Sequence, residues 1–182
     1  MPEPPQVPVG LETARQPLDE LCADILERHH AYAHGAIPVI RGWLNTLAAH
    51  EAAMPLLIAV RQGFATLADE LSAHLAKEEN ILFPALAAMA QASREGLTRP
   101  ALPFPTVLHP IRVMESDHAR IEGAMARLRE LTDGFVPPLG ASEAVQRGFR
   151  ELARLDGEIQ AHLHVENHVL FPRALQLERQ LL

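Results

Sequence analysis

Apolar residues recur at helical spacing along most of the chain, separated by prolines and glycines. The first such stretch begins near Pro17, which suits the first turn of a helix. Its apolar face carries Leu18, Leu21, Cys22, Ile25 and Leu26. Gly35 and Pro38 then interrupt the pattern, which predicts a kink or a break before a second helix over about residues 39–53.

Three further elements follow. One helix is predicted over about residues 56–92, with Pro84 inside it. Residues 93–110 contain four prolines and a glycine and are typical of a long connection. The next helix runs from about residue 111 to residues 133–134. After a turn at residues 135–141, the last helix spans about residues 142–180, with an interruption or bend near Pro172. Four long helices without strands predict an all-α, antiparallel four-helix bundle.

Composition agrees with this and narrows the functional classes. Helix formers dominate, and only 4% of residues are aromatic. The net charge is −7 and the sequence has no basic stripe, which argues against nucleic-acid binding. No apolar run approaches the ~20 residues that span a bilayer, so no membrane contact is expected. Residues 1–16 are expected to form a disordered tail that is not a secretory signal, and residues 17–182 one folded domain.

The chain has one cysteine, Cys22. An internal disulfide and a thiolate metal site are therefore excluded, and a reducing, cytoplasmic compartment is the simplest expectation. Because Cys22 lies on the apolar face of the first predicted helix, we expect it to be a small core residue.

One sequence motif occurs twice. HLAKEENILFPAL begins at His74, and HLHVENHVLFPRAL begins at His162, 88 residues later. Both copies open with His-x-x-x-Glu, and the same interval separates His30 from His118. The chain therefore contains an internal repeat of two helices, with two histidines and one glutamate in each half.

These repeated residues are candidate metal ligands. Residues i and i+4 of a helix share one face, and the apolar neighbours of each motif predict that this face points into the core. Buried carboxylates are costly unless a cation compensates them. The predicted ligands are His30, His74, Glu78, His118, His162 and Glu166. Such ligands suit a carboxylate-bridged pair of irons best, with manganese or zinc fitting less well.

Other polar residues near the motifs have more than one interpretation. His29 and Asp117 precede matched ligands and could either orient them or lie on the surface. Glu70, one turn before His74, could line a path to the metals or accept a proton, or it could be a solvated carboxylate. Three remaining histidines are expected to face solvent: His109, His164 and His168.

The segments HLAKEENILFP, IRVMESDH and HVENHVLFPRAL resemble the hemerythrin-like domain of the RIC family, which repairs iron–sulfur clusters after nitrosative and oxidative stress. The resemblance covers about residues 17–176. It implies a four-helix bundle with a non-haem di-iron centre bridged by oxygen and by the two glutamates. It also implies that Glu70 and Asp117 lie near a channel.

By the same resemblance, His50 is the candidate seventh ligand. Five histidines, two bridging carboxylates and a bridging oxygen would leave one position open on two six-coordinate irons. On a straight helix, however, His30 and His50 would lie ~30 Å apart, so the chain would have to turn near Gly35 and Pro38. His34, one turn after His30, is the rival.

The implied function is a response to nitrosative or oxidative stress, in which the centre binds or reduces nitric oxide, supplies iron to damaged iron–sulfur proteins, or both. The alternative is a module that binds nitric oxide or oxygen reversibly without turnover. The sequence does not decide between an enzyme and a binding protein, and it does not give the oligomeric state. Members of the RIC family often carry an N-terminal domain with a Cys-Cys motif, which this chain lacks. Functions that need those thiols are therefore not implied.

Overall fold

The computed structural model describes residues 16–50 and 55–182, except for the side chains of residues 48–50, and every regular element in these ranges is helical. The elements are α1 (Leu18–Ile25), η1 (Leu26–His30), α2 (Ala31–His50), α3 (Pro55–Lys77), η2 (Glu78–Leu82), α4 (Phe83–Arg94), α5 (Leu108–Leu131), α6 (Glu143–Val165), η3 (Glu166–Leu170) and α7 (Phe171–Gln180). Those labelled η are single π-helical turns. None of these helices is long and apolar enough to cross a membrane.

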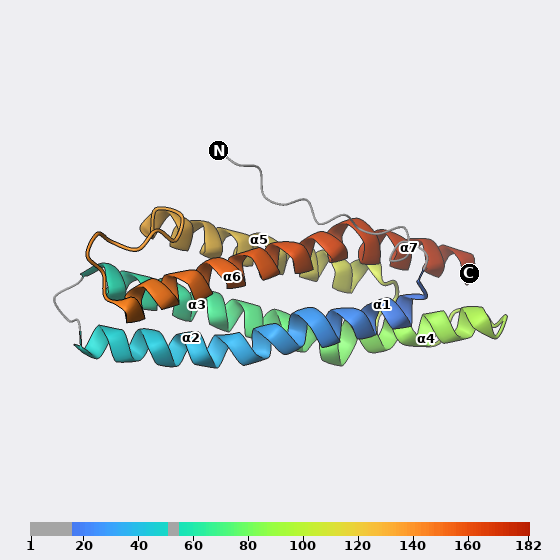
Figure 1. Ribbon diagram of the computed structural model, residues 1–182. Helices are drawn as coiled ribbons and strands as arrows, with labels where there is room; N and C mark the ends of the chain where they lie inside the picture. Colours follow the sequence, from blue (N-terminus) through green and yellow to red (C-terminus); the bar gives the residue numbers. More distant parts are fainter. Residues whose placement is uncertain (1–15, 51–54) are drawn as a thin grey trace.

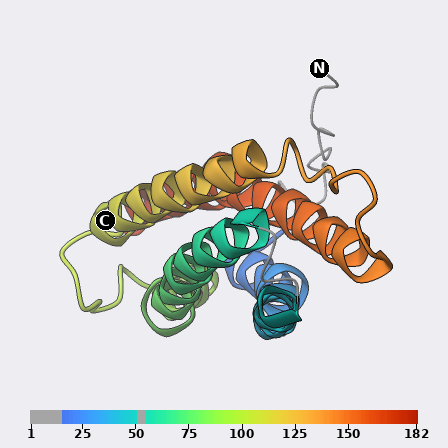
Figure 2. The ribbon, with the colours of Figure 1, turned by 90° about the vertical axis from the view of Figure 1, so that its left-hand side faces the viewer.

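Consecutive elements join into four long rods: α1-η1-α2, α3-η2-α4, α5, and α6-η3-α7. The rods lie side by side and alternate in direction, as Figures 1 and 2 show. α3 packs against both α2 and α5, α2 packs against α6, and α1 packs against α4. The predicted antiparallel four-helix bundle is confirmed.

Of the kink or break predicted near Gly35 and Pro38, the break is wrong. Helix α2 runs without interruption from Ala31 to His50, with Pro38 inside it. Gly35 and Pro38 are exposed, whereas Ala33, Ile37 and Ile40 are buried on the other face. Core packing on both sides of the proline therefore holds the helix together, since most helical stability in proteins comes from such packing.

The two Leu-Phe-Pro segments do not interrupt their rods either. Each is preceded by a π-helical turn, Glu78–Leu82 or Glu166–Leu170, and each turn begins at a glutamate of the repeat. Pro84 has no amide hydrogen, so the carbonyl of Asn80 loses its α-helical partner, and a local change of hydrogen-bond register is a common response. π turns of this kind are frequent at functional sites.

Two large apolar clusters fill the bundle. One includes Leu71 and Ile121, and the other includes Leu82 and Met114. Cys22 is buried in the second cluster, as predicted, and burial raises the pKa of its thiol to about 12. The six candidate ligands of the repeat lie near the boundary between these two clusters. A layer of histidine and glutamate therefore divides the core.

One tight contact fixes α6 against α2. The Trp43 indole lies over Gly148 and donates a hydrogen bond to the carbonyl oxygen of Ala144 at 3.1 Å. A Cβ at Gly148 would come within 1.8 Å of the Trp43 ring. We expect Gly148→Ala to destabilise the fold by about 2 kcal/mol, measured by urea unfolding. Gly157→Ala, in an open part of the same helix, should stabilise it by about 0.5 kcal/mol. Equal effects at the two sites would contradict this role of Gly148.

Candidate metal centre

Six of the seven predicted ligands converge in the middle of the bundle, and every rod contributes to the group. His30 ends η1, His74 lies in α3, His118 in α5 and His162 in α6, while the two glutamates begin η2 and η3. All six are between 0% and 2% exposed: His30, His74, Glu78, His118, His162 and Glu166. The repeat along the chain is thus a pseudo-twofold cluster in space.

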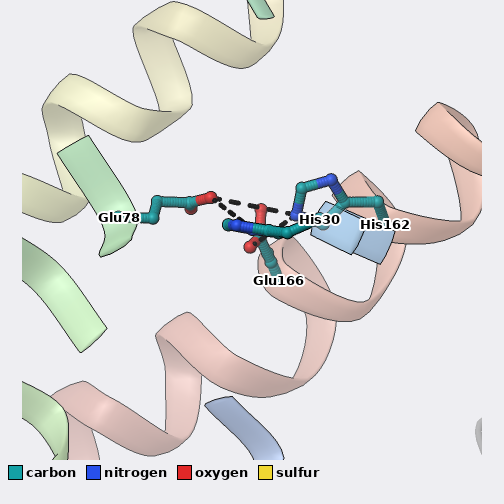
Figure 3. Close-up of side chains that lie close together, drawn as sticks. All are labelled: His30, Glu78, His162 and Glu166. Carbon is teal, nitrogen blue, oxygen red and sulfur yellow. Dashed lines mark hydrogen bonds and ion pairs between the residues drawn. The ribbon is translucent and has the colours of Figure 1, made fainter. Parts of the chain in front are cut away.

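One half of the cluster consists of His30, His162 and the two glutamates (Figure 3). His30 Nε2 lies 3.3 Å from Glu78 Oε2. His162 Nε2 lies 2.9 Å from Glu166 Oε1 and 3.8 Å from Glu78 Oε2. Side chains from three rods therefore meet at this position.

The other half consists of His74, His118 and the same two glutamates. His74 Nε2 lies 3.2 Å from Glu78 Oε2 and 3.9 Å from Glu166 Oε2. His118 Nε2 lies 3.1 Å from Glu166 Oε2. Both carboxylates are therefore shared between two groups of donors, as a bridged pair of cations requires.

The donor atoms also fit metal coordination. Ligand atoms about 2.1 Å from one ion and at right angles to each other lie about 3 Å apart, which matches the shorter distances above. Several of these buried atoms make no hydrogen bond within the described part of the chain: His30 Nε2, both ring nitrogens of His74, both oxygens of Glu78, His118 Nε2 and Glu166 Oε2. Buried polar atoms rarely remain without a partner, so their concentration here is what a cation-binding site would produce.

The pKa values of the same groups are shifted by their buried environment. Burial lowers the pKa of His74 to about 3, which keeps its imidazole neutral, the form that binds metals. Burial and the charge of Glu166 raise the pKa of Glu78 well above its usual range. Burial acts in the same direction on Glu166, but interactions with His162 and His118 outweigh it and lower the pKa of Glu166. A bound cation would offset the burial and the repulsion that raise the pKa of Glu78.

The outer nitrogens of two candidate ligands have partners that the sequence analysis did not identify. His30 Nδ1 lies 2.8 Å from Glu79 Oε1, and His118 Nδ1 lies 2.9 Å from Asn167 Oδ1. Glu79 and Asn167 are 88 residues apart, so the repeat itself held the signal. These contacts set the ring orientation and leave each Nε2 free to face the centre.

The matched pair His29 and Asp117 also lies beside the cluster. The His29 ring stacks on that of His162 at a centroid distance of 5.4 Å. Asp117 is buried, with Oδ2 4.0 Å from His74 Nδ1 and 2.5 Å from Lys77 Nζ, and it also pairs with Arg120. Both residues therefore border candidate ligands.

Comparison with known proteins decides the family. The protein-family model described as the hemerythrin HHE cation binding domain matches residues 21–174. The chain belongs to the hemerythrin HHE family. It thus has a metal-binding site, and the buried histidines and glutamates fit that role.

Several similar proteins carry the name iron-sulfur cluster repair protein YtfE. The protein from Edwardsiella ictaluri (strain 93-146) is 31% identical over 160 residues, which cover 87% of this chain and 66% of the relative. The Musicola paradisiaca (strain Ech703) protein is 30% identical, covering 89% and 68%, and that of Yersinia pseudotuberculosis serotype IB (strain PB1/+) is 26% identical, covering 90% and 69%. This hemerythrin chain therefore spans about two thirds of these relatives. The predicted resemblance to iron–sulfur cluster repair proteins is confirmed.

The seventh predicted ligand, His50, has a side chain outside the described residues. The turn that would bring it towards His30 is absent, since α2 is continuous. Its rival His34 is 54% exposed and lies 2.7 Å from Glu79 Oε1 rather than among the six converging ligands. Glu70, the other predicted channel residue, forms a 2.9 Å ion pair with Arg120.

The remaining histidines of the hemerythrin bundle, His109, His164 and His168, are exposed, as predicted. Because His164 and His162 lie on opposite sides of α6, we expect His162→Ala to lose at least one bound metal ion and His164→Ala to retain the full complement. Metal analysis of the two purified variants checks this. Equal metal loss in both would show that the helix faces are assigned incorrectly.

Proposed function

We propose that this chain holds two iron ions, one between His30 and His162 and the other between His74 and His118, with Glu78 and Glu166 bridging them. The observation that supports this most strongly is the sharing of both buried carboxylates by two separate histidine pairs. Neutral imidazoles and carboxylates suit ferrous and ferric iron, while the absence of cysteine from the cluster disfavours structural zinc.

Each ion would take two histidine nitrogens and two carboxylate oxygens from the protein. An ion that accepts six ligands then keeps positions for a bridging oxygen and for one small molecule. If only these four histidines bind, both ions have such a position, in contrast to the single one expected with His50. Bound iron would supply one-electron chemistry and affinity for nitric oxide or oxygen. The buried site would exclude bulk water and hold the ligands in place.

The proposed role is in the response to nitrosative and oxidative stress: binding or reducing nitric oxide, supplying iron to damaged iron–sulfur proteins, or both. The names of the relatives support cluster repair. The one cysteine is buried and free, which fits a reducing, cytoplasmic setting. Damaged iron–sulfur proteins would then be its macromolecular partners.

The second candidate is reversible binding of nitric oxide or oxygen without turnover. The pairing of Asp117 with Lys77 and Arg120, and of Glu70 with Arg120, favours it. Both carboxylates predicted to lie along a channel form ion pairs with these basic side chains, so neither is a free proton carrier in this arrangement.

Nitric oxide turnover separates the two candidates. The diferrous chain is mixed anaerobically with nitric oxide and a chemical reductant, and nitrous oxide is measured against protein. Formation of many equivalents of nitrous oxide supports reduction, because two nitric oxide molecules, two electrons and two protons yield one nitrous oxide and one water. A stable adduct without nitrous oxide supports binding. Iron supply is tested separately by the recovery of activity of a damaged [4Fe–4S] enzyme mixed with the loaded chain.

A further inference from the structure

A second group of potential metal-binding side chains lies directly outside the centre, on the surface side of His30. His34 Nε2 lies 2.7 Å from Glu79 Oε1, and the same oxygen lies 2.8 Å from His30 Nδ1. The His34 side chain is 54% exposed, that of Glu79 is 31% exposed, and that of His30 is 2% exposed. The three side chains therefore form a continuous path from solvent to a ligand of the centre.

The chemistry of this path matches that of the centre. One donor atom from each of the three residues lies within 4.8 Å of the others. Imidazole nitrogen together with carboxylate oxygen is a donor set for divalent transition-metal ions.

The other half of the pseudo-twofold bundle lacks this arrangement. Counting 88 residues on, Asn167 replaces Glu79 and Glu122 replaces His34. An amide is a much weaker ligand than a carboxylate. In the described part of the chain, groups of three or more potential ligands form the two halves of the centre and this path, and the path alone has an exposed member. The repeat has thus diverged at the position where one half opens to solvent.

We propose that His34 and Glu79 form a transit site for a divalent transition-metal ion such as ferrous iron, which they take from solvent and pass to the position between His30 and His162. The inference rests on the proposed di-iron centre and extends it by a route for loading and release. The incoming ion exchanges water for the His34 imidazole and the Glu79 carboxylate, with no change of oxidation state. It then moves past the His30 ring into the buried site.

A transit site changes rates and leaves the equilibrium unchanged. Apoprotein of the full chain is mixed anaerobically with ferrous iron, and uptake is followed in time. Release from the loaded protein is then followed with an excess of a ferrous chelator. We expect His34→Ala to slow both processes by about tenfold, the lower end of the effect of local ion capture on association rates. The final iron content should equal that of the wild type. Glu79→Gln, which keeps the shape of the side chain, should slow both processes as well.

The matched control is His164→Ala, which removes another exposed histidine and should load and release at the wild-type rates. Wild-type rates in His34→Ala would overturn the transit site while leaving the centre intact. A lower final iron content in His34→Ala would also overturn it, because His34 would then act as a ligand or support one. A wild-type chain that takes up no iron would contradict the centre itself, and the transit site with it.

Discussion

Replacement of Glu166 by alanine is expected to abolish the binding of both metal ions. Glu166 Oε1 lies 2.9 Å from His162 Nε2, and Glu166 Oε2 lies 3.1 Å from His118 Nε2, so one side chain serves both halves of the centre. His118→Ala, which removes a ligand of one half, should leave at least part of the other ion bound. Iron content after anaerobic reconstitution, measured by mass spectrometry, distinguishes the two outcomes.

Loss of the fold would not explain this result. In the apoprotein, Glu166 is a fully buried carboxyl group that is costly to accommodate, so its removal should leave the helical circular dichroism spectrum unchanged. The control is Glu115→Ala, the same substitution at an exposed position of α5. It should bind as much iron as the wild type. Retention of one tightly bound ion by Glu166→Ala would contradict the bridging role.

Removal of the metal is expected to lower the melting temperature of the wild-type chain by about 10 °C. Iron that binds only the native state at about 1,000 times its Kd adds about 4 kcal/mol of stability. A domain of this size shifts by roughly 2–4 °C for each kcal/mol. Removing the metal should destabilise the fold because it leaves buried nitrogen and oxygen atoms, including both oxygens of Glu78, without a partner.

Scanning calorimetry with and without a chelator measures this shift. The Glu166→Ala chain serves as the matched control and should melt at the same temperature in both conditions, since it has no metal to lose. A wild-type melting temperature that does not respond to the chelator, in protein shown to contain iron, would contradict the stabilising role of the centre.

The sequence predicted the bundle and the six converging residues because both follow from periodicity. Helical spacing placed His74 and Glu78 on one face, and the 88-residue repeat then paired each half with the other. Local rules failed at Pro38, where a residue known to break helices lies inside α2. Its effect depends on how firmly the buried face on either side is packed, which a local pattern does not report.

The residues around the ligands were harder to predict, because their role depends on contacts between rods. Glu79 is a neighbour of Glu78 in the sequence, and nothing local distinguishes it from a solvated helix carboxylate. Only the packing of η2 against η1 brings it to His30. Lys77 and Arg120 likewise became relevant only when the fold placed both beside Asp117. The equivalent positions of Glu79 and Asn167 in the two halves are the signal in the sequence that indicates them.

An anaerobic titration of the apoprotein with ferrous iron tests the central claim most directly. The account predicts tight uptake that ends at two ions per chain, one for each histidine pair that shares Glu78 and Glu166. An end point at one ion per chain, or no uptake at all, would contradict it.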